Sequence, residues 1–75
     1  MLCHLYVEKP LLKHIGEVIF KYDNPIVGDT ILFNNEQYTV LKREFNTNLK
    51  KFKNKTYESS DMNLILKQET FIYNN

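Results

Sequence analysis

Hydrophobic and polar residues alternate most regularly between residues 26 and 45. A Val-Gly-Asp sequence at 27–29 predicts a turn, because glycine tolerates positive φ and aspartate bonds nearby backbone groups. The residues at 30–33 are β-branched or apolar and predict a strand. After a short polar break, Tyr38 and Val40 resume the alternation, with a polar residue between them. This stretch therefore predicts two strands joined by a hairpin loop.

Other stretches predict further short strands. The loose alternation at 2–7 indicates a first strand, which Pro10 interrupts because proline cannot donate to a strand ladder. A second strand is expected over 14–22, with its more apolar set (Val18, Phe20 and Tyr22) facing inward and Ile19 exposed or covered by a loop. Residues 62–67 alternate well enough to favour a strand, and 71–73 indicate one more short strand.

Two places depart from simple alternation. Leu41 follows Val40 directly, so the strand is either buried on both faces there or contains a bulge that resets its parity. Residues 46–61 have no clean period and predict a long basic loop or hairpin. Because Leu49 and Phe52 recur at helical spacing, one short helical turn is the alternative within this range.

We therefore predict an all-β single domain over 1–75, built as a small antiparallel β-barrel or curled sheet of five to six short strands. A chain of this length buries only about 60% of its unfolded surface. The predicted core comes from the apolar parity of four separate runs and consists of Val18, Phe20, Ile31, Phe33, Tyr38, Val40, Leu64 and Leu66.

The sequence Val-Gly-Asp-Thr-Ile-Leu-Phe at 27–33, followed by Tyr-Thr-Val at 38–40, resembles strand starts in small barrels. These include Src-homology-type and pseudouridine-synthase-associated barrels. The resemblance covers about a quarter of the chain. It implies a fold and assigns no functional residue, because fold analogy alone does not carry function.

Composition restricts the setting of the protein. The single cysteine excludes an internal disulfide, and without a secretory n-region and h-region we expect a reducing, cytoplasmic location. No apolar run approaches the roughly 18 residues of a membrane span, so no membrane association is expected. The abundance of Asn, Lys and Ile is typical of AT-rich genomes and suggests a phage or mobile-element origin.

Candidate chemistry is sparse, and we expect no catalytic residues, metal or cofactor. Cys3, His4 and His14 are the only soft metal ligands, but a structural zinc site takes four ligands and adjacent residues of a strand point to opposite faces. A Cys3–His14 nucleophile has no support from spacing. The carboxylates that could pair for acid–base work are sufficiently explained by turns and solvent exposure: Glu17, Asp23 and Asp29.

Charge is concentrated in one segment. Residues 42–57 contain six basic residues and one acidic residue, which gives this segment a charge of +5. Because the net charge of the chain is +1, the remaining residues together carry a charge of −4. Aromatic residues lie among the cations, a combination that binds nucleic-acid backbones and bases or acidic protein surfaces. The alternative is a solvated loop whose lysines serve solubility. The predicted partner-binding residues are Lys42, Arg43, Lys50, Lys51, Phe52, Lys53, Lys55 and Tyr57.

The resulting expectation is a non-enzymatic binding module. Its favoured role is a protein-binding adaptor or inhibitor that docks an acidic partner through the basic segment and an exposed strand edge. Binding of single-stranded nucleic acid or RNA through the same segment is the alternative. Pairing of two copies through strand edges to form a homodimer also stays open.

Overall fold

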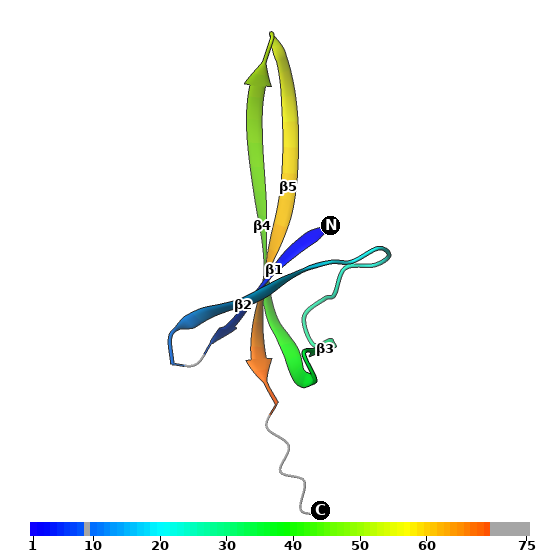
Figure 1. Cartoon of the computed structure of the whole chain (residues 1–75), viewed down its shortest axis with the longest axis vertical. Helices are drawn as coiled ribbons and strands as arrows, with labels where there is room; N and C mark the ends of the chain where they lie inside the picture. The colour runs from blue at the N-terminus through cyan, green and yellow to red at the C-terminus, as the bar shows by residue number, and fades with distance from the viewer. Residues whose placement is uncertain (9, 70–75) are drawn as a thin grey trace, which may run out of the picture.

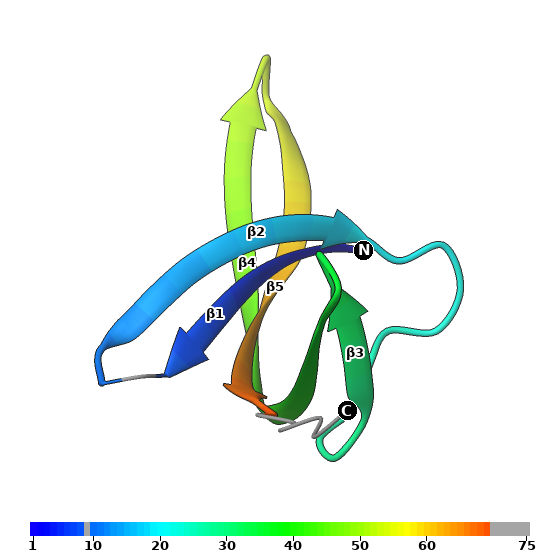
Figure 2. The ribbon, with the colours of Figure 1, turned by 60° about the horizontal axis from the view of Figure 1, so that its bottom comes forward.

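The computed structural model describes residues 1–8 and 10–69, which form one five-stranded sheet. The strands follow the order β2-β1-β5-β4-β3 across the sheet, which curls into a half-barrel (Figures 1 and 2). Their bounds are β1 (Leu2–Glu8), β2 (Leu12–Ile19), β3 (Thr30–Phe33), β4 (Glu36–Phe52) and β5 (Lys55–Gln68). The all-β prediction is confirmed, and the predicted strand at 71–73 lies outside the described residues.

The sheet is mixed rather than purely antiparallel. β1 and β5 run parallel, from the pair Cys3–Met62 to the pair Val7–Leu66, whereas every other neighbouring pair is antiparallel. The alternation of a strand fixes which residues share a face but not the direction of its neighbour. The pairing of the first described strand with the last was therefore outside the reach of the sequence pattern.

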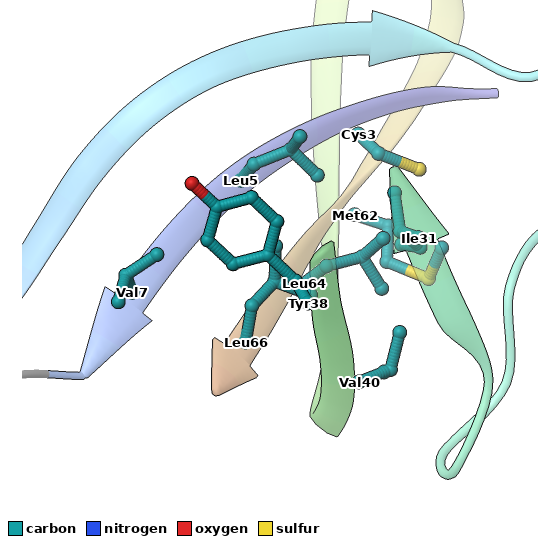
Figure 3. Close-up of a cluster of buried hydrophobic side chains, with 9 residues drawn as sticks. All are labelled: Cys3, Leu5, Val7, Ile31, Tyr38, Val40, Met62, Leu64 and Leu66. Atoms are coloured by element: carbon teal, nitrogen blue, oxygen red, sulfur yellow. The ribbon is translucent and has the colours of Figure 1, made fainter. Parts of the chain in front are cut away.

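One face of the curled sheet carries the core. Nine buried apolar side chains gather on it (Figure 3), and β1 and β5 together supply six of them. Five of the eight predicted core residues are buried, and the other three (Val18, Phe20 and Phe33) are partly buried against them. The inward prediction for Tyr22 is wrong: β2 ends at Ile19, and Tyr22 is 93% exposed in the following loop.

The predicted turns are present. Gly28 has a φ of +96°, as the turn at 27–29 requires. Asn34 and Asn35 both have positive φ, the conformation of a two-residue type I′ hairpin turn. Lys53 and Asn54 repeat this conformation between β4 and β5. A second tight hairpin turn therefore lies within residues 46–61, for which a long loop was one of the predicted alternatives.

The predicted bulge at Leu41 is also present. The pairing of β4 with β5 passes from Val40–Leu66 directly to Lys42–Ile65, so Leu41 is the extra residue. Before the bulge Tyr38 and Val40 face the core, and after it the parity is reversed. The bulge therefore places Arg43 and Phe45, opposite Leu64 and Met62, on the same face of the sheet as Tyr38 and Val40.

Residues 46–61 continue β4 and β5 as a two-stranded hairpin, which we call the arm. It begins where β5 no longer pairs with β1, and it projects from the body of the sheet (Figure 1). The described chain is 62 Å long and 19 Å thick. The hairpin alternative for this range is confirmed, and the helical turn is wrong, because cross-strand pairing continues to Phe52–Lys55.

The two edge strands approach each other across the core. A Cβ atom built on Gly16 of β2 would lie 2.5 Å from Cζ of Phe33 on β3, closer than real Cβ contacts. Only a residue without a side chain admits the Phe33 ring at this distance. Gly16 therefore allows the Phe33 ring of β3 to pack directly against the backbone of β2.

We expect Gly16→Ala to destabilise the protein by about 1–3 kcal/mol, as overpacking does elsewhere. In a Phe33→Leu background the shorter side chain removes the clash, and Gly16→Ala should become neutral or stabilising by up to about 1 kcal/mol, because alanine is favoured over glycine within a strand. Denaturant unfolding of the four proteins measures this coupling. An equal cost of Gly16→Ala in both backgrounds would contradict the proposed contact.

Candidate functional site

The structure divides the basic segment between the body and the arm. Lys42 and Arg43 precede the arm and point to opposite faces of β4, as adjacent strand residues do. Lys42 forms an ion pair with Glu44 at 3.4 Å. The Arg43 guanidinium lies 5.1 Å from the centre of the Phe45 ring, and its Nε donates to Sδ of Met62 at 3.4 Å. Both cations thus have partners within the sheet.

The remaining predicted binding residues lie on the arm. Lys51 and Lys55 are exposed close to its end, and Lys53 is exposed within the turn itself. The backbone of Lys50, Phe52 and Tyr57 belongs to the arm strands, but their side chains lie outside the described part of the structure. The lysines are therefore brought together at the end of a projecting ribbon.

Both strands of the arm have an open edge. β3 pairs with β4 only as far as Thr39, and β1 pairs with β5 only from Met62 onward. Among the described residues, no further strand lies beside the arm. Unpaired N–H and C=O groups along such edges can accept a strand of another chain.

A polar cluster occupies the opposite, convex face of the sheet at the base of the arm. The two ring nitrogens of His4 face two carboxylates: Nδ1 lies 3.1 Å from Oε1 of Glu17, and Nε2 lies 3.1 Å from Oδ2 of Asp61. His14 Nε2 is 4.0 Å from the same Glu17 oxygen. The cluster thus joins β1, β2 and β5, the last at a residue of the arm.

A second bulge creates this cluster. The pairing of β1 with β2 passes from Leu5–Gly16 to Tyr6–His14, which makes Ile15 the extra residue. In a regular strand, residues three apart point to opposite faces. Because of the bulge, His14 and Glu17 instead share the convex face with His4. His4, His14 and Glu17 were named separately as candidates from the sequence, but their convergence was not predicted, because the bulge at Ile15 leaves no signal in the alternation.

The hydrogen bonds of the cluster shift two pKa values in opposite directions. The bond to the Asp61 carboxylate raises the pKa of His4, and the bond to Glu17 adds to the effect. The same bond to His4 lowers the pKa of Asp61, with a further contribution from the amide of Asn46. The protonated His4 imidazole and the ionised Asp61 carboxylate therefore stabilise one another.

Cys3 lies away from this cluster. It is fully buried in the core, and burial raises the pKa of its thiol. His4 follows it in the chain and lies on the convex face. The predicted separation of these two residues onto opposite faces is confirmed, and the core does not bring Cys3 to a histidine.

Of the three carboxylates considered for acid–base work, Glu17 lies apart from Asp23 and Asp29. Glu17 belongs to the convex cluster. Asp29 accepts a hydrogen bond from the backbone N–H of Ile26 at 3.0 Å and so holds the turn before β3. A shallow hollow of about 440 Å³ beside this turn is lined in part by Asp23 and Asp29. The structural role of Asp29 agrees with its turn prediction.

No protein-family model, curated protein or solved structure matches the chain. The described residues include no helix with the length and apolar character to cross a membrane. Functional inference therefore depends on the arm and the convex cluster.

The cluster makes stability depend on pH. A raised His4 pKa contributes stability that is complete below the ordinary histidine pKa of about 6.5 and is lost as pH rises through the folded value. A lowered Asp61 pKa contributes stability that is present above about pH 4 and is lost as pH falls through the folded value. His4→Gln should therefore lower the free energy of unfolding most between about pH 4 and 6.5, and less on either side. EDTA in the buffer keeps trace metal ions from contributing to the measurement.

Denaturant unfolding at a series of pH values measures this cost. The Asp61→Asn background serves as the control, because there the pH dependence of the His4→Gln cost should shrink. A cost of His4→Gln that is constant from acid to alkaline pH would contradict the assigned bonds.

Proposed function

We propose that this protein is a non-enzymatic binding module whose arm docks on an acidic protein surface. The observation that carries the proposal is the arrangement of the arm: lysines at the end of a two-stranded ribbon whose outer edges are open. Opposite charge steers such a ribbon to its partner, and main-chain bonds to an open edge can then hold it there.

The positive charge of the arm also disfavours pairing of two copies of this chain through their arms. Like charges on edge strands disfavour pairing of identical edges, which is one way in which proteins prevent aggregation. Two copies of this chain that met through their arms would bring their lysines together. A homodimer would therefore use an edge strand of the body, β2 or β3; of these, β2 exposes Leu12 and Ile19.

An acidic protein is favoured over nucleic acid by the balance of charge. The chain has a net charge of only +1 and a pI near 7.8, whereas nucleic-acid-binding domains are commonly strongly basic. Outside residues 42–57 the chain is acidic overall and would repel an extended phosphate backbone. A local basic arm needs only a local acidic patch.

Nucleic acid remains the second candidate because of the shape of the arm. A two-stranded ribbon fits the major groove of a duplex, and lysine contacts phosphates without sequence preference. Described polar residues of the arm, such as Thr47 and Thr56, are exposed and could donate hydrogen bonds. This candidate predicts that log affinity falls linearly with log salt concentration.

Charge reversal on the arm tests the proposal. The double variant Lys51→Glu/Lys55→Glu should slow association with the partner by about tenfold or more at low salt, with little change in dissociation. Because exposed lysines contribute little to stability, its melting temperature should stay close to that of the original. The matched control is Lys21→Glu/Lys67→Glu, which makes the same change in net charge on exposed lysines of the body.

The partner for this measurement comes from retention on the immobilised protein in extracts of the native host prepared with and without nuclease treatment. We expect an acidic protein that the body variant retains and the arm variant loses. Equal retention by both variants would contradict docking through the arm. Retention that disappears with nuclease treatment would replace the acidic protein with nucleic acid.

A further inference from the structure

Three side chains that can bind metal converge on the convex face of the β1–β2 hairpin. One ligand atom from each of His4, His14 and Glu17 lies within 4.8 Å of the others. In a tetrahedral zinc site with bonds of 2.0–2.2 Å, ligand atoms lie about 3.4 Å apart. His4 Nδ1 is already 3.1 Å from the Glu17 oxygen, and His14 Nε2 is 4.0 Å from it. Small side-chain rotations would therefore bring all three to one ion.

A fourth residue orients the first histidine. His4 Nε2 lies 3.1 Å from Oδ2 of Asp61, which directs the other ring nitrogen, Nδ1, toward Glu17. Metal-binding histidines usually donate their second ring N–H to a carboxylate in this manner, which fixes the tautomer and the ring orientation. Asp61 is therefore placed as a positioning residue for a ligand at Nδ1.

We propose that His4, His14 and Glu17 bind one divalent transition-metal ion, with Zn²⁺ as the expected ion and Asp61 orienting His4. The ion would lie between groups that now contact each other directly. Two imidazoles and one carboxylate suit zinc and its neighbours in the first transition row, whereas Ca²⁺ and Mg²⁺ prefer sites made of oxygen alone.

The scaffold of the site supports this assignment. All four residues lie on strands, and His4 is held directly opposite Glu17 by the pairing of β1 with β2. Sites on paired strands are held more precisely than sites on loops. The side chains of His14 and Glu17 are about half exposed, at 47% and 51%, so water can reach the ion and complete its coordination.

Metal titration of the tag-free, EDTA-treated full chain at one fixed pH tests the proposal. Zn²⁺ should bind with one ion per chain in a competition assay, and Co²⁺ should give the visible absorption of a site with nitrogen and oxygen ligands. Asp61→Asn should weaken binding by about 10–100-fold, the usual effect of losing an orienting carboxylate, without changing the shape of the Co²⁺ spectrum. His14→Ala and Glu17→Gln should each weaken it more and alter the spectrum.

Three controls separate this site from other sources of binding. Cys3→Ser removes the buried thiol, and Glu36→Gln removes a carboxylate at the β3–β4 turn, so neither should change the affinity. The arm variant Lys51→Glu/Lys55→Glu should also bind normally, which keeps this proposal separate from docking through the arm.

Several results would overturn the proposal. One is that Zn²⁺ does not bind with one ion per chain. Another is that neither His14→Ala nor Glu17→Gln weakens Zn²⁺ binding, and a third is that Cys3→Ser abolishes it. Circular dichroism of each metal-free variant shows whether it is folded. Because His14 is exposed and makes no core contact, His14→Ala keeps the test decisive even if another variant unfolds.

Discussion

Burial of a single apolar face holds this small sheet together. The side chains that are fully buried come mainly from β1 and β5, whose parallel pairing places Cys3, Leu5 and Val7 beside Met62, Leu64 and Leu66. Each is an apolar side chain whose transfer from water contributes on the order of 1–3 kcal/mol. The other three strands extend this face or close over it. A chain of 75 residues has little apolar area to spare, so the remaining features of the molecule depend on this one pairing.

Two bulges adapt the sheet to this one-sided core, and they also set the limits of sequence interpretation. Alternation predicted the strands, and the glycine and asparagine residues predicted the turns at Gly28 and Asn34. The predicted core contained five of the ten buried hydrophobic residues and none of those from β1. The bulge at Leu41 left a visible break in the alternation, and it was predicted as one of two alternatives. The bulge at Ile15 left no such break, because its neighbours are a glycine and a histidine that fit either face. The convex cluster depends on that second bulge and was therefore missed.

The sequence also predicted the arrangement of the proposed binding residues only in part. Counting charge along the chain located the lysines of the arm, but it could not separate them from Lys42 and Arg43, which have partners in the body. The arm itself was hard to predict because none of its described side chains belongs to the buried core, and its sequence has no clean apolar alternation. A two-stranded ribbon without a covered face is marginally stable in water. The arm is therefore held by its hairpin turn, its cross-strand pairs and its continuity with the body.

Native-state hydrogen exchange measured residue by residue by NMR tests this account most directly. The ladder amides between β1 and β5 that lie under the core, those of residues 4–6 and 63–65, should exchange only through global unfolding, with the full free energy of unfolding. Amides of residues 47–51 and 55–60 in the arm should exchange through local opening at much lower free energy. Protection of the arm equal to that of the β1–β5 ladder would contradict the central claim that the buried face, and not the sheet as a whole, holds the molecule together.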